Sequence, residues 1–421
     1  MRIVILNTFE RTRGAAVAAS RLREALRADG EEVTMVVRDK QSDCKQVIGV
    51  TGSSWQRLLH KGYFIGERLV IFLHNRCSKN DLFAVSLANT GCKLSQLPAL
   101  QQADIIHLHW INQGFLSLDE LKAIGALGKP MVWTMHDMWP CTGICHHARE
   151  CNGYHTDCAV CPFTASPTLA AHTLAKKKRI WEKLNVTFVT CSNWLMERTS
   201  QSVLMSDKTV LSIPNPIDTQ KFAPLDQAVC RAHFGLPKEK TLLLFGAVKA
   251  SDKRKGIDYM KAAVQILVDT HPQWKEQVEL AIFGKSEVEM QSLFPVKVHQ
   301  IPYITSEQEM IQLYNTADLY VTSSLEENLP NTIMEAMSCG VPCAGFEIGG
   351  IPEMIDHLEN GYVAAYKSAD DLAEGIHQLL QDADFARFKQ NARDKVIRSY
   401  SFASVAKRYK DLYAQLLEPV K

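Results

Sequence analysis

The sequence predicts an α/β fold with two domains, each built on a parallel β-sheet. Short apolar runs alternate with helical patterns along nearly the whole chain, and several runs are rich in β-branched residues, which is typical of buried parallel strands. The runs fall into two sets with a proline-rich stretch between them. The length of 421 residues also suits two or three domains that each bury a core of their own.

The strand-like runs are short, and helical patterns separate them, so each set is predicted to form one parallel sheet. The first set comprises residues 2–6, 33–37, 105–109, 131–135 and 186–190. The second set comprises residues 241–245, 279–283, 297–300, 318–322 and 341–346.

A linker is expected where the two sets meet, because the stretch LSIPNPIDTQKFAPLD, residues 211–226, holds three prolines. We therefore expect an N-terminal Rossmann-like domain over residues 1–212 and a second one over residues 213–398. The amphipathic tail, residues 402–417, is expected to close the fold as a helix within residues 399–421. Ligands of open α/β sheets bind beyond the carboxyl ends of the strands, so a cleft between the two facing domains is the expected active site.

The composition indicates a cytoplasmic enzyme. The net charge is +1, so a general attraction to nucleic acid is not indicated. The start, MRIVILNTFE, has the pattern of a first strand rather than of a signal peptide. No apolar run approaches the roughly 18 residues that a membrane-spanning helix needs.

Two carboxylates stand out in the stretch from residue 317 to residue 353. Glu327 lies in a predicted loop and Glu335 in the helix that follows, with seven residues between them, so two acids on different elements can serve one ligand. Free backbone N–H groups at a helix start, together with the pair Gly349 and Gly350, are suited to bind phosphate. These features predict a nucleotide-sugar site.

A basic loop follows the first strand of the second set. The segment GAVKASDKRKG carries Lys249, Lys253, Arg254 and Lys255. Sugar transfer from a nucleotide needs positive side chains and N–H dipoles that stabilise the leaving diphosphate, and Lys255 fits that role. Arg254 and Lys249 are candidates for a further phosphate contact, and Arg254 can grip phosphate oxygens in a bidentate manner. The alternative is a solvated, charged loop.

The motifs of the second half, in the order in which they occur along the chain, resemble those of the retaining glycosyltransferases of family four, which have the two-domain GT-B fold. The resemblance rests on IPNPIDTQKF, the Lys255-Gly256 pair, the spacing of the two glutamates, GVPCAGFEIGGIPEMI and NGYVA. It extends to the first half through Arg13-Gly14-Ala15, WTMHD and CSNWL. It is closest to transferases of capsule and exopolysaccharide assembly, colanic acid type, which share HDMWPCTG followed by a cysteine cluster.

The resemblance implies transfer of a hexose, with retained configuration, from an NDP-sugar of the UDP or GDP type. The implied acceptor is a saccharide, with a lipid-linked saccharide as the leading candidate, and no catalytic metal is implied. Glu335 would hold the ribose hydroxyls, Glu327 would approach the donor sugar, and backbone N–H groups of Asn328 and Leu329 would meet sugar or phosphate. The chain departs from the family at Ala247, where an arginine is usual, and in the loop EENLPNT, which lacks the frequent glycine and phenylalanine.

In the first domain, His136 follows a predicted strand, and the resemblance makes it a contact of the donor sugar or of the transition state. The alternative is a structural histidine, which is also the expectation for His107 and His109. Gly14 allows a close backbone approach at the first turn. Arg13 stands where the family often has a glycine, which suggests an anionic acceptor.

Four cysteines form a dense cluster in the loop 141–162, with the spacing C-x5-C-x6-C-x2-C: Cys145, Cys151, Cys158 and Cys161. A C-x2-C pair with two nearby thiols can close a tetrahedral structural zinc site, and a loop with little apolar content gains order from the metal. Unligated thiols, a disulfide and an iron-sulfur centre are the alternatives.

The segment 53–79 mixes large apolar residues with Arg57, Lys61, Arg68 and Arg76. Helices of this composition can lie on anionic membranes, and peripheral contact with the inner face of the membrane would suit a lipid-linked acceptor. A plain surface helix is the alternative.

Two other classes of function stay open. A sugar-nucleotide epimerase or hydrolase of the same fold would act on the donor without an acceptor, and a non-catalytic sugar-nucleotide-binding protein would bind the donor without turnover. The glutamate pair and the cationic loop favour catalysis.

Overall fold

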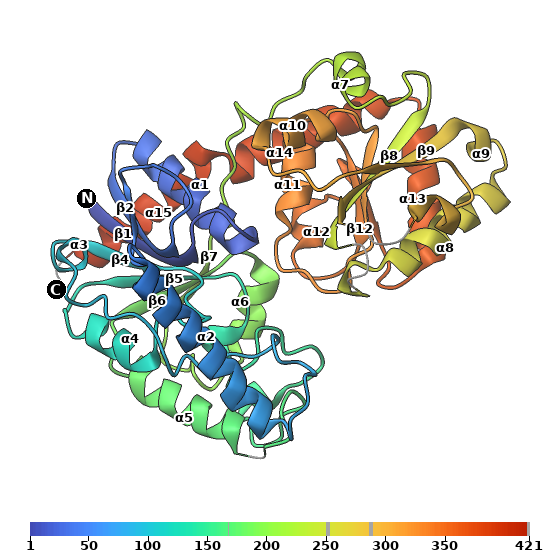
Figure 1. The fold of residues 1–421 in the computed structure, drawn as a ribbon. Coiled ribbons are helices and arrows are strands. Elements are labelled where there is room, and N and C mark those ends of the chain that lie inside the picture. Colours follow the sequence, from blue (N-terminus) through green and yellow to red (C-terminus); the bar gives the residue numbers. More distant parts are fainter. Residues whose placement is uncertain (167, 250–252, 286–288, 419–421) are drawn as a thin grey trace. The chain divides into compact units, whose positions relative to one another are not determined.

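The computed structural model describes residues 1–166, 168–249, 253–285 and 289–418, and the chain divides into two compact units (Figure 1). The first unit contains residues 1–216 together with the chain from Val405 onward, and the second contains residues 217–404. The boundaries expected from the sequence, after residues 212 and 398, lie slightly before the observed ones.

The first unit is built on a seven-stranded parallel sheet with the order β3-β2-β1-β4-β5-β6-β7. The strands are β1 (Arg2–Phe9), β2 (Glu32–Asp39), β3 (Val47–Gly49), β4 (Ile105–Leu108), β5 (Met131–Met135), β6 (Val186–Thr190) and β7 (Val210–Ser212). The strand order reverses between β1 and β4, and the carboxyl ends of strands at such a reversal are where open α/β sheets usually bind ligands.

Helices flank this sheet: α1 (Gly14–Ala28), α2 (Ser54–His74), α3 (Pro98–Gln101), α4 (Leu118–Gly125), η1 (Trp139–Cys141), η2 (Gly153–His155), α5 (Leu169–Trp181), α6 (Asn193–Ser200) and α15 (Phe402–Leu417). Every residue of β4, β5 and β6 is buried, because helices cover both faces of a parallel sheet.

The second unit is built on a six-stranded parallel sheet with the order β10-β9-β8-β11-β12-β13. Its strands are β8 (Thr241–Lys249), β9 (Val278–Lys285), β10 (Val298–Ile301), β11 (Leu319–Thr322), β12 (Cys343–Phe346) and β13 (Gly361–Ala364). The order reverses between β8 and β11, so the usual ligand position of this fold lies at their carboxyl ends.

The helices of the second unit are α7 (Gln227–His233), η3 (Lys253–Lys255), α8 (Ile257–Thr270), α9 (Trp274–Gln277), η4 (Met290–Leu293), α10 (Glu307–Tyr314), α11 (Asn331–Ser338), α12 (Ile351–Met354), α13 (Ala369–Gln381) and α14 (Phe385–Tyr400). The prediction of two parallel-sheet α/β domains is thus confirmed. The short edge strands β3, β7 and β13 were not predicted: β3 and β7 have only three residues, and β13 (GYVA) begins with a glycine and has only two large apolar residues.

The C-terminal helix α15 packs into the first unit, although the whole second unit precedes it in the chain. Tyr413 Oη lies 2.7 Å from Nδ1 of His107, and Tyr409 Oη lies 2.7 Å from Oγ1 of Thr134. All four side chains are buried, and Thr134 Oγ1 also lies 2.7 Å from Nε2 of His107, so the two tyrosines join a hydrogen-bonded network inside the core.

Across the described residues, the helices are all too short or too polar to traverse a lipid bilayer.

Candidate active site

The predicted site residues fall into two groups, one in each unit. In the second unit, they gather at the carboxyl ends of β8 and β11, where the strand order reverses. Lys255 ends η3, and its ammonium group forms an ion pair with the Glu327 carboxylate, which lies in the loop after β11. The side chains are 32% and 15% exposed, respectively, so both are within reach of a ligand. Two residues predicted from separate motifs therefore contact each other.

Two glycines make this contact possible. At Gly256, with φ +64°, an added Cβ atom would lie 1.9 Å from the carbonyl oxygen of Ser323, and at Gly349, with φ +59°, it would lie 1.9 Å from that of Glu327. Ser323 Oγ also donates to the Gly256 carbonyl at 2.7 Å, and Leu325 N–H donates to the Arg254 carbonyl at 2.7 Å. The basic loop is thereby held against the loop that carries Glu327.

The Gly349-Gly350 pair has a role that the sequence did not indicate. The Gly350 N–H donates to the carbonyl oxygen of Asn328 at 2.6 Å, so in this arrangement it holds the loop and is not directed at a ligand. Leu329 is buried and Asn328 is half-buried, so the segment before α11 is packed on the unit.

Glu335 lies on α11, and Tyr314 Oη at the end of α10 donates to its Oε2 at 2.7 Å. Tyr314 is fully buried, and burial together with the Glu335 charge raises its pKa well above the usual value, so it stays a donor. Sequence reasoning missed Tyr314, because its partner lies on the following helix.

Arg254 and Lys249 are the other cationic candidates, and the structure describes the side chain of Arg254 but not that of Lys249. Arg254 is exposed, and its backbone carbonyl anchors Leu325. Lys249 is the last residue of β8, and its side chain lies outside the described residues.

In the first unit, His136 lies beyond the carboxyl end of β5 and is half-buried. Its Nε2 lies 2.9 Å from Nδ1 of His109, and its Nδ1 lies 3.5 Å from Sγ of Cys191. Burial lowers the pKa of His136 to about 4, although Asp137 opposes the shift, so the ring is neutral at neutral pH. Both ring nitrogens of His136 have partners within the protein, so its side chain contributes to the packing of this unit.

Asp137 organises the same region. Its carboxylate accepts hydrogen bonds from Trp110 Nε1 at 2.8 Å, from the Trp139 N–H at 2.9 Å and from His146 Nδ1 at 2.7 Å. Burial would raise its pKa, but His146 and these hydrogen bonds lower it to about 2. His146 Nε2 in turn lies 2.9 Å from Ser86 Oγ. This Ser-His-Asp line resembles a hydrolase triad in connectivity only, because Ser86 is 1% exposed and no substrate can reach it.

Arg13 and Gly14 lie where α1 begins. Arg13 has φ 78° and ψ 159°, a backbone conformation that is essentially reserved for glycine and costs about 1–3 kcal/mol for other residues. Its guanidinium lies 5.3 Å from the centre of the Phe9 ring, and that of Arg38 lies 5.1 Å from the same ring. Two cations therefore flank the carboxyl ends of β1 and β2.

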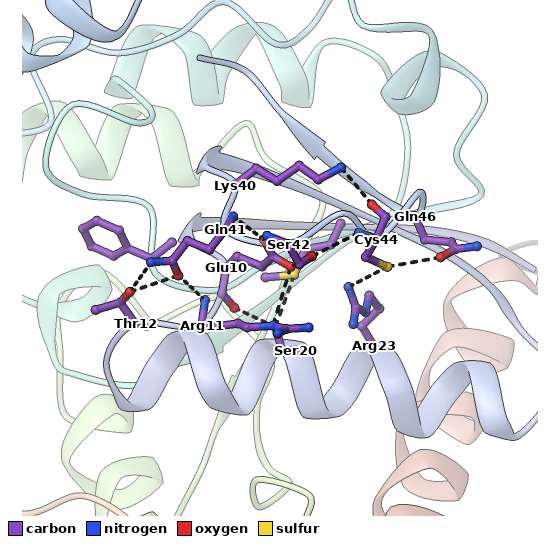
Figure 2. Close-up of polar contacts among 12 residues, drawn as sticks. Glu10, Arg11, Thr12, Ser20, Arg23, Lys40, Gln41, Ser42, Cys44 and Gln46 are labelled. Carbon is purple, nitrogen blue, oxygen red and sulfur yellow. Dashed lines mark hydrogen bonds and ion pairs between the residues drawn. The ribbon is translucent and has the colours of Figure 1, made fainter. Parts of the chain in front are cut away.

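Figure 2 shows the carboxylate that fixes the neighbouring loops. Glu10 is fully buried and accepts hydrogen bonds from the N–H groups of Gln41 and Ser42, at 2.6 and 2.9 Å, and from the Ser42 hydroxyl. Gln41 Oε1 accepts from the Arg11 N–H at 3.1 Å. The loops after β1 and β2 are thus tied together through Glu10 before any ligand binds.

The four clustered cysteines line one cavity of the first unit: Cys145, Cys151, Cys158 and Cys161. Their thiols are free, and backbone N–H groups donate to sulfur, as from Gly153 to Cys151 at 3.4 Å. Burial raises the pKa of Cys145 to about 12. The four thiols do not have the arrangement expected of a zinc site. Within the described ranges, no three His, Cys, Asp or Glu side chains are arranged to hold a metal ion.

Two family profiles match the chain. One, described as glycosyl transferases group 1, matches residues 230–395, and one described as glycosyltransferase family 4 matches residues 12–221.

Curated relatives are distant. The N-acetyl-alpha-D-glucosaminyl L-malate synthase of Bacillus anthracis is 24% identical over 227 residues, which cover 53% of this chain and 58% of that protein. This chain spans about half the length of the first relatives that it matches. The putative colanic acid biosynthesis glycosyl transferase WcaC of Escherichia coli K12 is 25% identical over 351 residues, which cover 80% of each chain.

Solved structures share the fold over nearly the whole chain. A sucrose-phosphate synthase from Thermosynechococcus elongatus has a TM-score of 0.65 at 19% identity and covers 98% of each chain. Anabaena HepE in complex with UDP has a TM-score of 0.63 at 15% identity, with 99% of this chain and 100% of that one covered. WaaG, a glycosyltransferase involved in lipopolysaccharide biosynthesis, has a TM-score of 0.60 at 15% identity, with 98% and 99% covered. The predicted GT-B fold is confirmed.

The buried histidines predict that the first unit loses stability in mild acid. Burial lowers the pKa of His107 to about 3 and that of His109 well below its usual value. In the unfolded chain both titrate near pH 6.5. As the pH falls below that value, the unfolded state binds protons that the folded state does not, so stability should fall by about 1.4 kcal/mol per pH unit for each histidine.

Urea unfolding at pH 7, 6 and 5, followed by tryptophan fluorescence, measures this slope. His109→Gln should make the slope shallower, whereas His172→Gln, which changes an exposed histidine of the same unit, should leave it unchanged. Equal slopes for His109→Gln and the wild type would contradict the assignment.

Zinc in the cysteine loop stays a prediction, which metal analysis tests. Protein purified without chelators should contain about one zinc per chain, and Cys158→Ser with Cys161→Ser should remove the metal and lower the melting temperature. Ser substitution of Cys230, a buried cysteine of the second unit, is the control that should retain zinc. A content below about 0.3 zinc per chain in the wild type would rule the site out.

Proposed function

Because the chain belongs to the glycosyltransferases, with a family 4 domain followed by a group 1 domain, we propose that it transfers a hexose from an NDP-sugar to a saccharide acceptor with retention of configuration. We place the reaction in surface polysaccharide assembly, with a lipid-linked saccharide as the acceptor. The similarity to WcaC over 80% of both chains supports this setting, and the UDP bound to HepE supports a donor of the UDP type.

The observation that carries the proposal is the ion pair between Lys255 and Glu327 at the carboxyl ends of β8 and β11. A diphosphate carries more negative charge than one carboxylate, and it attracts the ammonium group more strongly in a site with little water. Donor binding would transfer Lys255 from Glu327 to the diphosphate. The released carboxylate could then accept a hydrogen bond from a hydroxyl of the donor sugar.

The group that leaves is the nucleoside diphosphate. In the proposed step, the bond between the anomeric carbon and the phosphate oxygen breaks, and the leaving diphosphate keeps the electron pair. The acceptor oxygen bonds to the anomeric carbon on the same face, and its proton passes to a phosphate oxygen. No protein nucleophile is assigned, and the task of Lys255 is to stabilise the charge that develops on the diphosphate.

Glu335 is the proposed ribose contact. Its carboxylate is held by Tyr314, whose hydroxyl donates at 2.7 Å from a fully buried position. A carboxylate that is oriented in advance can accept hydrogen bonds from two vicinal hydroxyl groups without further ordering of its side chain.

Lys255→Ala and Glu327→Ala should each lower kcat/KM by at least about ten-fold, which corresponds to about 1.4 kcal/mol. Lys297→Ala is the matched control, because Lys297 also pairs with a glutamate of this unit, Glu279, at 3.8 Å but is 63% exposed. Wild-type kcat/KM in both site variants, measured with purified protein and a saturating acceptor, would overturn the assigned site.

A donor screen tests the activity itself. Thermal shifts with UDP-, GDP- and ADP-sugars should identify one donor that stabilises the wild type, and Lys255→Ala should weaken that shift. Incubation of this donor with a lipid-linked saccharide extract should then yield a product of retained anomeric configuration. Donor consumption without an acceptor would instead support the epimerase or hydrolase, and binding without turnover would support the non-catalytic alternative.

A further inference from the structure

Helix α2 has the opposite burial pattern to an ordinary surface helix, because it buries polar side chains and exposes apolar ones. It runs from Ser54 to His74, starts with a capping box between Ser53 and Gln56, and lies along the first unit (Figure 1). The side chains that it buries are mostly polar or charged, and its large apolar side chains point away from the core. In soluble proteins the apolar stripe of a helix normally faces the core.

The buried face is held by polar contacts. Glu67 and Arg68 form an ion pair at 2.8 Å and are 1% and 8% exposed. Glu67 Oε1 accepts the N–H groups of Leu87 and Ala88 at 2.6 and 2.9 Å, and Arg68 donates to the carbonyl oxygen of Val85 at 2.9 Å. These bonds fix the rotation of α2 about its axis, so the opposite face is kept outward.

The outward face carries six large apolar residues that are between 42% and 72% exposed: Trp55, Leu58, Leu59, Ile65, Leu69 and Leu73. With 3.6 residues per turn they occupy an arc of about 120°, opposite the buried face. Phe83 is also 66% exposed, but its ring lies 6.4 Å from that of Phe64, which faces the buried side of α2, so Phe83 does not belong to this face. We call the six outward residues the α2 patch.

The exposed charges on α2 and on the turn that follows it, up to residue 80, are of one sign, and the next residue, Asp81, is paired with Arg149. From residue 55 to residue 80 the only acidic residue is Glu67, which is buried. The exposed basic side chains of this segment are Arg57, Lys61, Arg76 and Lys79. Arg68, which the sequence grouped with these, is buried in its ion pair and does not contribute.

We propose that the α2 patch binds the surface of a membrane that contains anionic lipids. A helix of 21 residues is about 31 Å long and can lie flat in the interface, with its apolar face among the acyl chains and its basic residues at the headgroups. The single sign of the exposed charge favours anionic lipid over a second copy of this chain, because two cationic faces would repel each other. This inference does not depend on the proposed function, since membrane binding needs neither donor nor acceptor.

Vesicle flotation at moderate salt tests the proposal with the full chain. The wild type should float with vesicles of phosphatidylcholine and phosphatidylglycerol and bind at least about ten-fold less to phosphatidylcholine alone. Leu58→Ser, Leu69→Ser and Leu73→Ser combined should reduce binding to the anionic vesicles by at least about ten-fold. Arg57→Glu with Lys61→Glu should do the same.

The matched control combines Leu225→Ser, Val229→Ser and Ile397→Ser, which remove three exposed apolar side chains from the second unit and should leave binding unchanged. Trp55 gives a second readout, because it is the one exposed tryptophan among the described residues. Vesicles of brominated lipid should quench its fluorescence, and Trp55→Phe should abolish that part of the quenching.

Three outcomes would overturn the proposal. They are a wild type that binds no vesicles, equal vesicle binding by the wild type and the serine variant, and a wild-type dimer in solution that the serine variant converts to a monomer. Unchanged circular dichroism of the serine variant shows that its fold is retained. Assays of sugar transfer in the absence of membranes separate a failure of this proposal from a failure of the proposed function.

Discussion

A contact between two backbone segments that only glycine permits holds Lys255 and Glu327 in place. With a Cβ atom at Gly256, the carbonyl of Ser323 would be 1.9 Å away, so any other residue would push the basic loop off the loop after β11. That close approach is what lets Lys255 reach Glu327. The cation and the carboxylate are therefore positioned by contacts within the fold, which is the kind of preorganisation that stabilises developing charge.

In the first unit, two carboxylates hold the loops at the strand ends in place. Glu10 joins the loops after β1 and β2, and Asp137 joins the loops after β4 and β5 to the cysteine-rich segment. Backbone N–H groups donate to both carboxylates; Glu10 also accepts from the Ser42 hydroxyl and lies 3.7 Å from Nε of Arg11, and Asp137 accepts from the side chains of Trp110 and His146. In both units the residues at the strand ends are thus fixed by short-range polar contacts that form with the fold.

The sequence was sufficient to predict the two sheets, because long strands such as β1 and β8 carry strong apolar patterns. The motifs around Lys255 and Glu327 singled out two residues that the structure brings into contact, and their part in donor binding stays a prediction. It could not reveal Tyr314 as the partner of Glu335, or the use of the Gly350 N–H within the protein, since both depend on contacts between separate elements. It also grouped Arg68 with exposed basic residues, because the burial of an ion pair leaves no periodic signal. The arrangement of the four cysteines likewise depends on how a loop without regular structure folds.

The position of α15 has a consequence for how the protein is made. In the core of the first unit, Tyr413 is the partner of Nδ1 of His107 and Tyr409 contacts Thr134. Both tyrosines follow the second unit in the chain, so they are synthesised after it. The second unit, whose residues are contiguous, can fold as soon as it has left the exit tunnel. Synthesis of the first unit therefore begins before that of the second unit, but its core is completed only after the second unit has been made, when α15 supplies the partner of Nδ1 of His107.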